Sequence, residues 1–121
     1  PADLCGKWFG KIFAQTPDID VLYLQDIGGR CLVDFDVDLP NWFAEIKKAC
    51  DANGVIFGVD IESFKECWCP RITMRTKPWI ELEEQLRVAG MFTDHITNFS
   101  WATFKPGTDT YEGYKKYLER K

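Results

Sequence analysis

The chain has 121 residues, a length that fits one domain with its own core and is short for two. Its formal net charge is −4, and no cluster of lysine and arginine is available to neutralise phosphates, so we do not expect nonspecific binding to nucleic acid or to an anionic membrane. No apolar stretch approaches the roughly 20 residues that cross a bilayer. Aromatic residues make up 15% of the chain and predict a core built on large rings.

The first third of the chain is predicted to form three strands. Residues 6–15 are rich in large apolar side chains that do not alternate cleanly, which predicts a strand with a bulge near Gly10. Residues 20–27 alternate well and lead into Gly28-Gly29, a pair typical of a tight hairpin. Residues 30–38 alternate as well, so we expect an antiparallel meander.

Helices and strands are interleaved in the rest of the chain. Residues 40–53 have the pattern of an amphipathic helix closed by Asn53-Gly54, and residues 55–61 form a β-rich run that predicts a central strand. If this strand lies parallel to residues 32–38, the two form a right-handed crossover around the helix. Residues 71–76 predict an edge strand, 78–89 a second helix, 91–104 a strand, turn and strand, and 110–120 a third helix.

Together these elements predict a single α+β domain over residues 1–121. We expect a mostly antiparallel sheet of five to six strands, with two to three helices packed on one face. Strands come first in this pattern and helices follow, which is why an antiparallel sheet is favoured over a parallel one.

The carboxylates of the alternating strand are the first candidates for chemistry. Asp34 and Asp36 share one strand face, and Asp60 ends the predicted central strand. Oxygen ligands at this spacing can hold Mg²⁺ or Mn²⁺ and support phosphoryl or nucleotidyl transfer. Asp34-Phe35-Asp36 resembles the first motif of archaeo-eukaryotic primase and polymerase domains, whose later histidine and acidic motifs have no convincing counterpart in this chain. A solvated strand face is the simpler interpretation and the favoured one.

His95 and the cysteines give weaker indications. His95 is the only histidine, so any histidine-based acid or base step would use it, although a lone histidine is more often structural. The five cysteines permit two disulfides with one thiol left over, and Asn98-Phe99-Ser100 fits the N-glycosylation pattern. Both features fit a secreted protein, while an odd cysteine count fits a reduced interior equally well. The sequence therefore favours neither a secreted nor an intracellular location.

Trp8, Trp68 and Trp101 are candidates for stacking on a sugar or another flat ligand if their rings are exposed. The leading hypothesis is a small acidic binding domain that takes a protein partner, or a small neutral or cationic ligand, in an aromatic-lined pocket. The alternative is a metal-dependent transfer enzyme that uses Asp34 and Asp36 with Asp60. The enzyme requires these carboxylates to converge in a cleft, whereas the binding domain leaves them spread on an open face.

Overall fold

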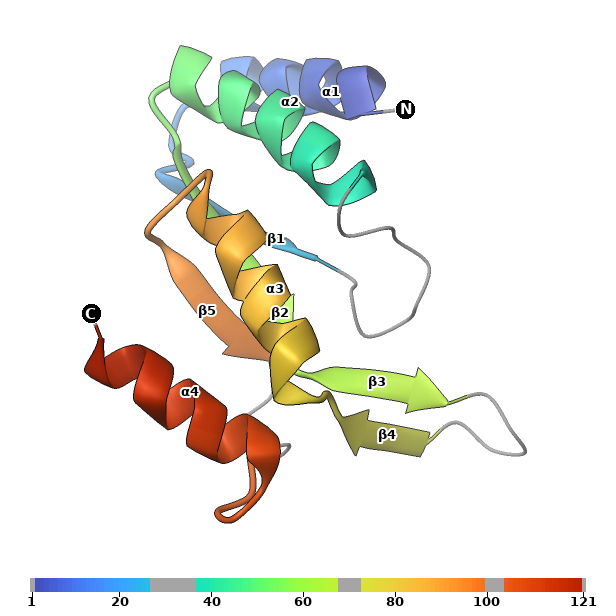
Figure 1. Cartoon of the computed structure of the whole chain (residues 1–121). Coiled ribbons are helices and arrows are strands. Elements are labelled where there is room, and N and C mark those ends of the chain that lie inside the picture. Colours follow the sequence, from blue (N-terminus) through green and yellow to red (C-terminus); the bar gives the residue numbers. More distant parts are fainter. Residues whose placement is uncertain (1, 27–36, 68–72, 100–103, 121) are drawn as a thin grey trace.

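The computed structural model describes residues 2–26, 37–67, 73–99 and 104–120. Four helices and five strands lie within these ranges (Figure 1). Their order is α1 (Ala2–Gln15), β1 (Val21–Gln25), α2 (Asp38–Ala52), β2 (Ile56–Glu62), β3 (Phe64–Cys67), β4 (Thr73–Thr76), α3 (Trp79–Gly90), β5 (Ile96–Phe99) and α4 (Asp109–Glu119). Among the described parts of the chain, no helix is long and apolar enough to cross a membrane.

Three strands form a parallel sheet with the order β1-β2-β5. Val21 of β1 lies opposite Ile56 of β2, and Val59 of β2 lies opposite Ile96 of β5. The segment between β1 and β2 contains α2, and the segment between β2 and β5 contains α3, so the sheet is built from successive strand–helix–strand units. The antiparallel hairpin β3–β4 extends from the carboxyl end of β2 (Figure 1).

The core lies between one face of the parallel sheet and the helices. Phe57, Val59 and Ile61 alternate along β2 and are buried on this face. Phe43 of α2 packs edge-on against Phe57, with ring centroids 5.9 Å apart. The core also contains Phe13, Leu39, Ile46, Leu82, Leu86 and Val88. Because α1 packs against α2 and α4 packs against α3, these two helices extend the layer that covers the sheet.

The opposite face of the sheet exposes large apolar side chains. Val21, Tyr23 and Ile56 are 39%, 46% and 45% exposed. The ring of Tyr23 lies over Gly58, where an added Cβ would come within 2.5 Å of the tyrosine Cε1 atom. Parallel sheets are normally covered on both faces. This face of the sheet is therefore exposed at Val21, Tyr23 and Ile56, whereas Glu62, further along the same face, is buried.

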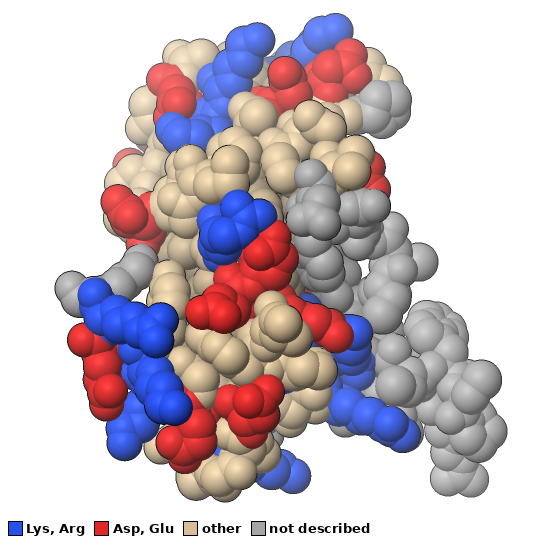
Figure 2. Space-filling view, viewed as in Figure 1, with Lys and Arg blue, Asp and Glu red and all other residues tan. Residues whose placement is uncertain are grey.

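Basic and acidic side chains are interspersed on the face of the molecule that Figure 2 shows. Lys47 pairs with Asp51 along α2 at 2.7 Å, and Lys65 of β3 pairs with Glu81 of α3 at 2.6 Å. Exposed pairs of this kind contribute up to about 1 kcal/mol each. The pair between Lys65 and Glu81 helps to hold the hairpin against the start of α3.

The start of α4 is joined to the segment that precedes α3. The Trp79 main-chain N–H donates to the Asp109 carboxylate over 3.0 Å, and the Thr110 hydroxyl donates to the Lys77 carbonyl oxygen. One turn further along α4, Gly113 leaves room for the Trp79 ring, which any Cβ at this position would meet. The first turns of α3 and α4 are therefore held together by hydrogen bonds and close packing.

The predicted fold class is wrong. The described residues form three parallel strands and a separate antiparallel pair, with four helices, and not a mostly antiparallel sheet of five to six strands. Residues 6–15 belong to α1 and not to a bulged strand, because Phe9, Ile12 and Phe13 recur at helical spacing and turn toward the core. The strand–helix–strand crossover around α2 exists, with β1 as the first strand, while most of residues 32–38 lie outside the described residues.

Most other predicted elements are confirmed. The structure has the strand within residues 20–27, the helix at 40–53, the central strand, the second helix and the C-terminal helix. Gly54 has a φ of +69°, as expected of the residue that follows a helix end. Of the two strands predicted in residues 91–104, the structure has β5. The Gly28-Gly29 turn and most of the acidic strand lie outside the described residues.

Candidate functional site

Polar side chains gather where β1 and β2 end. In a parallel sheet the carboxyl ends of the strands meet at one edge, and open α/β sheets bind their ligands at this edge. Gln25, the last residue of β1, lies opposite Asp60 of β2, and Glu62 is the last residue of β2. Asp26 follows β1 directly, and its main-chain N–H donates to the Asp60 carbonyl over 3.1 Å. Four polar residues from two strands thus share this edge.

Glu62 is held through both its side chain and its main chain. Its carboxylate accepts a hydrogen bond of 2.7 Å from Gln25 Nε2, and its main-chain N–H donates to the Asp26 carboxylate over 3.1 Å. Glu62 is 3% exposed and Asp26 is 2% exposed. Buried carboxylates are costly unless they are hydrogen-bonded or paired. These bonds hold Glu62 in a defined position.

Asp60 lies two residues before Glu62 and projects from the same face of β2. Its carboxylate accepts a hydrogen bond of 2.9 Å from the Thr97 hydroxyl of β5. Asp60 is half-buried, while Thr97 and Gln25 are exposed. The α-carbons of two residues at this spacing on a strand are about 7 Å apart. Two carboxylates, each held from a neighbouring strand, therefore lie side by side on one face of β2, where Asp60 is half-buried and Glu62 is buried.

A chain of buried polar side chains lies behind Glu62. Gln85 of α3 donates from Nε2 to the Asp26 carboxylate over 2.6 Å, and Lys77 Nζ donates to Gln85 Oε1. Lys77 is 0% exposed. Burial lowers the pKa of Lys77 from its ordinary value of 10.5 to about 8, although the carboxylates of Asp26, Glu81 and Glu62 act in the opposite direction. A lysine with this pKa changes its charge just above neutral pH.

The residues predicted for the metal site are only partly described. Asp34 and Asp36 lie outside the described residues, so their convergence with Asp60 stays a prediction. In the part of the chain that the structure describes, no group of three or more histidine, cysteine, aspartate and glutamate side chains could hold a metal ion. His95 is exposed and directly precedes β5, where its main-chain N–H donates to the Thr93 hydroxyl over 3.0 Å.

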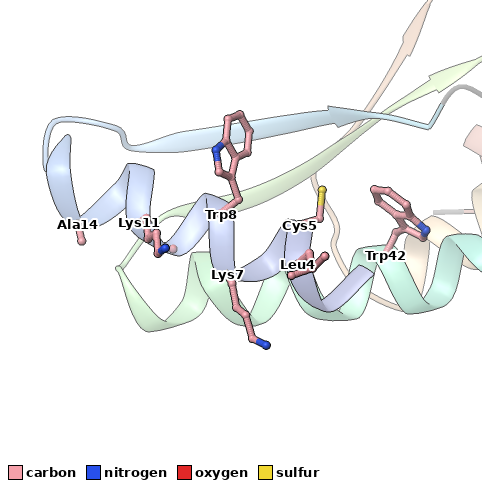
Figure 3. Close-up of a pocket in the computed structure, with 8 residues that line it drawn as sticks. Leu4, Cys5, Lys7, Trp8, Lys11, Ala14 and Trp42 are labelled. Carbon is pink, nitrogen blue, oxygen red and sulfur yellow. The ribbon is translucent and has the colours of Figure 1, made fainter. Parts of the chain in front are cut away.

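Of the three tryptophans predicted to contact a ligand, the structure describes Trp8 alone. Trp8 is 60% exposed on α1 and lines a groove of about 870 Å³ together with Leu4 and Trp42, which belongs to α2 (Figure 3). None of the polar residues around Glu62 lines this groove. Trp68 and Trp101 lie outside the described residues. The aromatic groove and the strand ends are therefore separate places on the molecule.

Cys5 and Cys50 both carry free thiols, so the three cysteines that remain can form at most one disulfide within the chain. Cys50 is buried in α2. Burial raises the pKa of its thiol to about 11, and the neighbouring Asp51 carboxylate adds to the rise, while Lys47 opposes it. Because the thiolate is the reactive form, Cys50 should be chemically inert in the folded protein.

We expect iodoacetamide at pH 8 to modify Cys5 much faster than Cys50 in the folded protein, because Cys5 is only half-buried. Peptide mass spectrometry after timed quenching measures the two rates separately. In urea both residues should react at similar rates, which serves as the control. Equal rates in the native protein would show that Cys50 is accessible and would contradict its placement in the core.

The sequence pattern did not identify Gln25, Asp26 and Glu62 as site residues, nor Lys77 and Gln85. The sequence did contain one signal, because Gln25 and Asp26 end one alternating apolar segment, and Asp60 and Glu62 end another. Such residues converge only if the two strands are parallel neighbours. The antiparallel arrangement that we expected would have placed them at opposite edges of the sheet.

No protein-family model matches this chain, and no curated protein is detectably similar to it in sequence. A solved structure from Bacteroides thetaiotaomicron, named "putative alpha-L-fucosidase", matches it with a TM-score of 0.76 at 22% sequence identity. The match covers 98% of this chain and 37% of that one, so this chain spans well under half of its neighbour's length. At this level of identity the similarity shows a shared fold alone.

Proposed function

We propose that this chain binds a neutral, hydroxyl-rich ligand, a sugar, at the carboxyl end of its parallel sheet, with Asp60 and Glu62 as the central contacts. The observation that carries the proposal is the placement of these two carboxylates, which are held by Thr97 and Gln25 from the flanking strands. Carboxylate and amide groups fixed in this way can accept and donate hydrogen bonds to sugar hydroxyls without first being ordered. Gln25 and Thr97 are exposed and Asp60 is half-buried, so a ligand can approach from their side of the sheet, and it would meet Glu62, which is 3% exposed, beneath them.

The same pair supports glycoside hydrolysis as the reaction. Hydrolysis of a glycosidic bond commonly uses two carboxyl groups roughly 5–10 Å apart, one acting as acid and the other as nucleophile or base. Asp60 and Glu62 alternate on one strand face at a compatible spacing. The name of the Bacteroides neighbour refers to the hydrolysis of fucosides and is consistent with this substrate class.

We expect L-fucose to raise the midpoint of thermal unfolding of the wild-type chain, and Glu62→Gln to abolish this rise. A ligand that binds only the native state stabilises it by about 1.4 kcal/mol when its concentration is ten times its Kd. Glu83→Gln is the matched control, because it makes the same change at an exposed glutamate of α3. Differential scanning fluorimetry over a sugar concentration series measures the effect.

Two further measurements define the outcome. If neither L-fucose nor any sugar in a panel of monosaccharides and disaccharides shifts the midpoint, or if Glu62→Gln shifts as the wild type does, the proposal is wrong. Release of nitrophenol from 4-nitrophenyl α-L-fucoside, lost in both Glu62→Gln and Asp60→Asn, would extend binding to hydrolysis. A midpoint that rises with millimolar Mg²⁺ or Mn²⁺ and no longer does so in Asp34→Asn would instead favour metal-dependent transfer.

A further inference from the structure

We propose that Lys77 is a positioning residue for Glu62, and that it acts through Gln85 and Asp26 to hold the main chain of Glu62 where β2 ends. The inference rests on the proposed function for what Glu62 binds, but the hydrogen bonds that carry it are independent of any ligand. Lys77 and Gln85 are both buried, so direct contact with a ligand would not explain why polar residues occupy these positions.

The hydrogen bonds from Lys77 to Glu62 run in one direction. A protonated lysine can only donate, so the Gln85 amide must turn its oxygen toward Lys77 and its nitrogen toward Asp26. Asp26 then accepts from Gln85 Nε2 with one carboxylate oxygen and from the Glu62 N–H with the other. The lysine therefore determines the orientation of the glutamine amide, and the amide fixes the carboxylate that receives the Glu62 N–H.

The same residues hold the main chain on both sides of Glu62. Gln85 Nε2 also lies 3.4 Å from the Glu62 carbonyl oxygen, and the Lys77 main-chain N–H donates to the Ser63 carbonyl oxygen over 2.9 Å. Asp26 donates its own N–H to the Asp60 carbonyl oxygen over 3.1 Å. Four consecutive peptide groups at the end of β2, from residue 60 to residue 64, are thus contacted by this network.

Packing alone does not explain a lysine at this position. Lys77, Gln85 and Asp26 are 0%, 1% and 2% exposed, and apolar side chains that replace a whole buried polar group of this kind often pack as stably. The lowered pKa of Lys77 shows that burial disfavours its charged form, even though the carboxylates of Asp26, Glu81 and Glu62 act in the opposite direction, while Lys65 among the described residues adds a like charge. A costly residue that is connected to a site residue is a candidate for a role in that site.

The test is hydrogen exchange of the Glu62 amide, followed by NMR in the full chain without ligand. Lys77→Met keeps the length of the side chain but removes the donor to Gln85. We expect the Glu62 amide to exchange about tenfold faster in this variant, because Lys77 no longer orients the Gln85 amide that holds the acceptor Asp26. The Val59 amide, which donates to the His95 carbonyl oxygen in the middle of the same strand, should be unchanged. Lys65→Met, which removes a partly exposed lysine of β3, is the matched control and should alter neither amide.

An unchanged Glu62 amide in Lys77→Met would overturn the proposal, as would an equal acceleration at Val59, because Lys77 would then support the fold as a whole. Gln85→Leu breaks the same connection and must reproduce the local effect, and it decides the matter if Lys77→Met does not fold. Affinity for L-fucose in the same proteins separates this inference from the proposed function. If the wild type binds no sugar while the Glu62 amide still responds to Lys77→Met, the sugar proposal fails and the positioning role stands.

Discussion

Replacing Gly6 with alanine is expected to lower the free energy of unfolding by about 1–3 kcal/mol. Gly6 is buried where α1 crosses α2, and an added Cβ would lie 2.7 Å from the main-chain carbonyl oxygen of Glu45. A main-chain atom cannot rotate out of the way as the end of a side chain can, so the two helices would have to move apart. This movement would loosen the contact of Phe9 and Phe13 with the rest of the core.

Gly10→Ala provides the matched control, because Gly10 lies one turn further along α1 and an added Cβ would meet nothing within 4 Å. In an open helical position alanine is more favourable than glycine by up to about 1 kcal/mol. Urea unfolding followed by circular dichroism should therefore show a lower midpoint for Gly6→Ala and an equal or higher one for Gly10→Ala. If Gly6→Ala were as stable as Gly10→Ala, the close packing of α1 on α2 would be incorrect.

The titration of Lys77 is expected to increase the free energy of unfolding as the pH rises from about 8 to 10.5. Its pKa is about 8 in the folded protein and returns to the ordinary 10.5 on unfolding. Below about pH 8 both states hold the proton, so folding bears the whole cost of burying the charge. Between the two values the unfolded state binds more protons, and the free energy of unfolding therefore increases with pH. At about 1.4 kcal/mol per pKa unit, the total gain is about 3 kcal/mol.

The difference between wild type and Lys77→Met isolates this contribution. Other groups titrate in the same range, including Cys50, whose raised pKa makes stability fall as the pH increases above about 9. These contributions are common to both proteins and cancel in the difference. Urea unfolding at pH 7, 8, 9 and 10 should show the wild type gaining stability relative to Lys77→Met. If the difference in the free energy of unfolding between the two proteins were constant over this range, folding would not lower the pKa of Lys77.

The sequence was sufficient for most helices. In α2 and α3 the apolar residues recur at helical spacing, and each helix begins beside a proline and ends near a glycine, so the pattern and the end signals agree. In the segment that forms α1, the apolar spacing and the signals for helix ends do not agree in this way. Two adjacent pairs of apolar residues, Trp8 with Phe9 and Ile12 with Phe13, satisfy a helix with one buried face, yet they also resemble a dense strand.

The sheet could not be predicted in the same way, because alternation along a strand records which face is buried and not the direction of the neighbouring strand. The alternation of β1 was identified correctly, but the glycine pair after it favoured a hairpin, and the observed partner β2 runs parallel to it. The candidate site depends on this pairing. Gln25 and Glu62 are 37 positions apart in the chain and meet only because β1 and β2 end at the same edge.

The bonds between α4 and the segment before α3 have a consequence for regulation. Thr110 and Asp109 bind the main chain at Lys77 and Trp79, and Lys77 also reaches Glu62 through Gln85 and Asp26. A ligand that prefers the ordered end of β2 would therefore also favour the docked position of α4. Because such coupling is reciprocal, an interaction that stabilises the docked position of α4 would strengthen ligand binding by the same coupling free energy. The hydrogen bonds thus connect α4, through Lys77, to the edge of the sheet where we propose that the ligand binds.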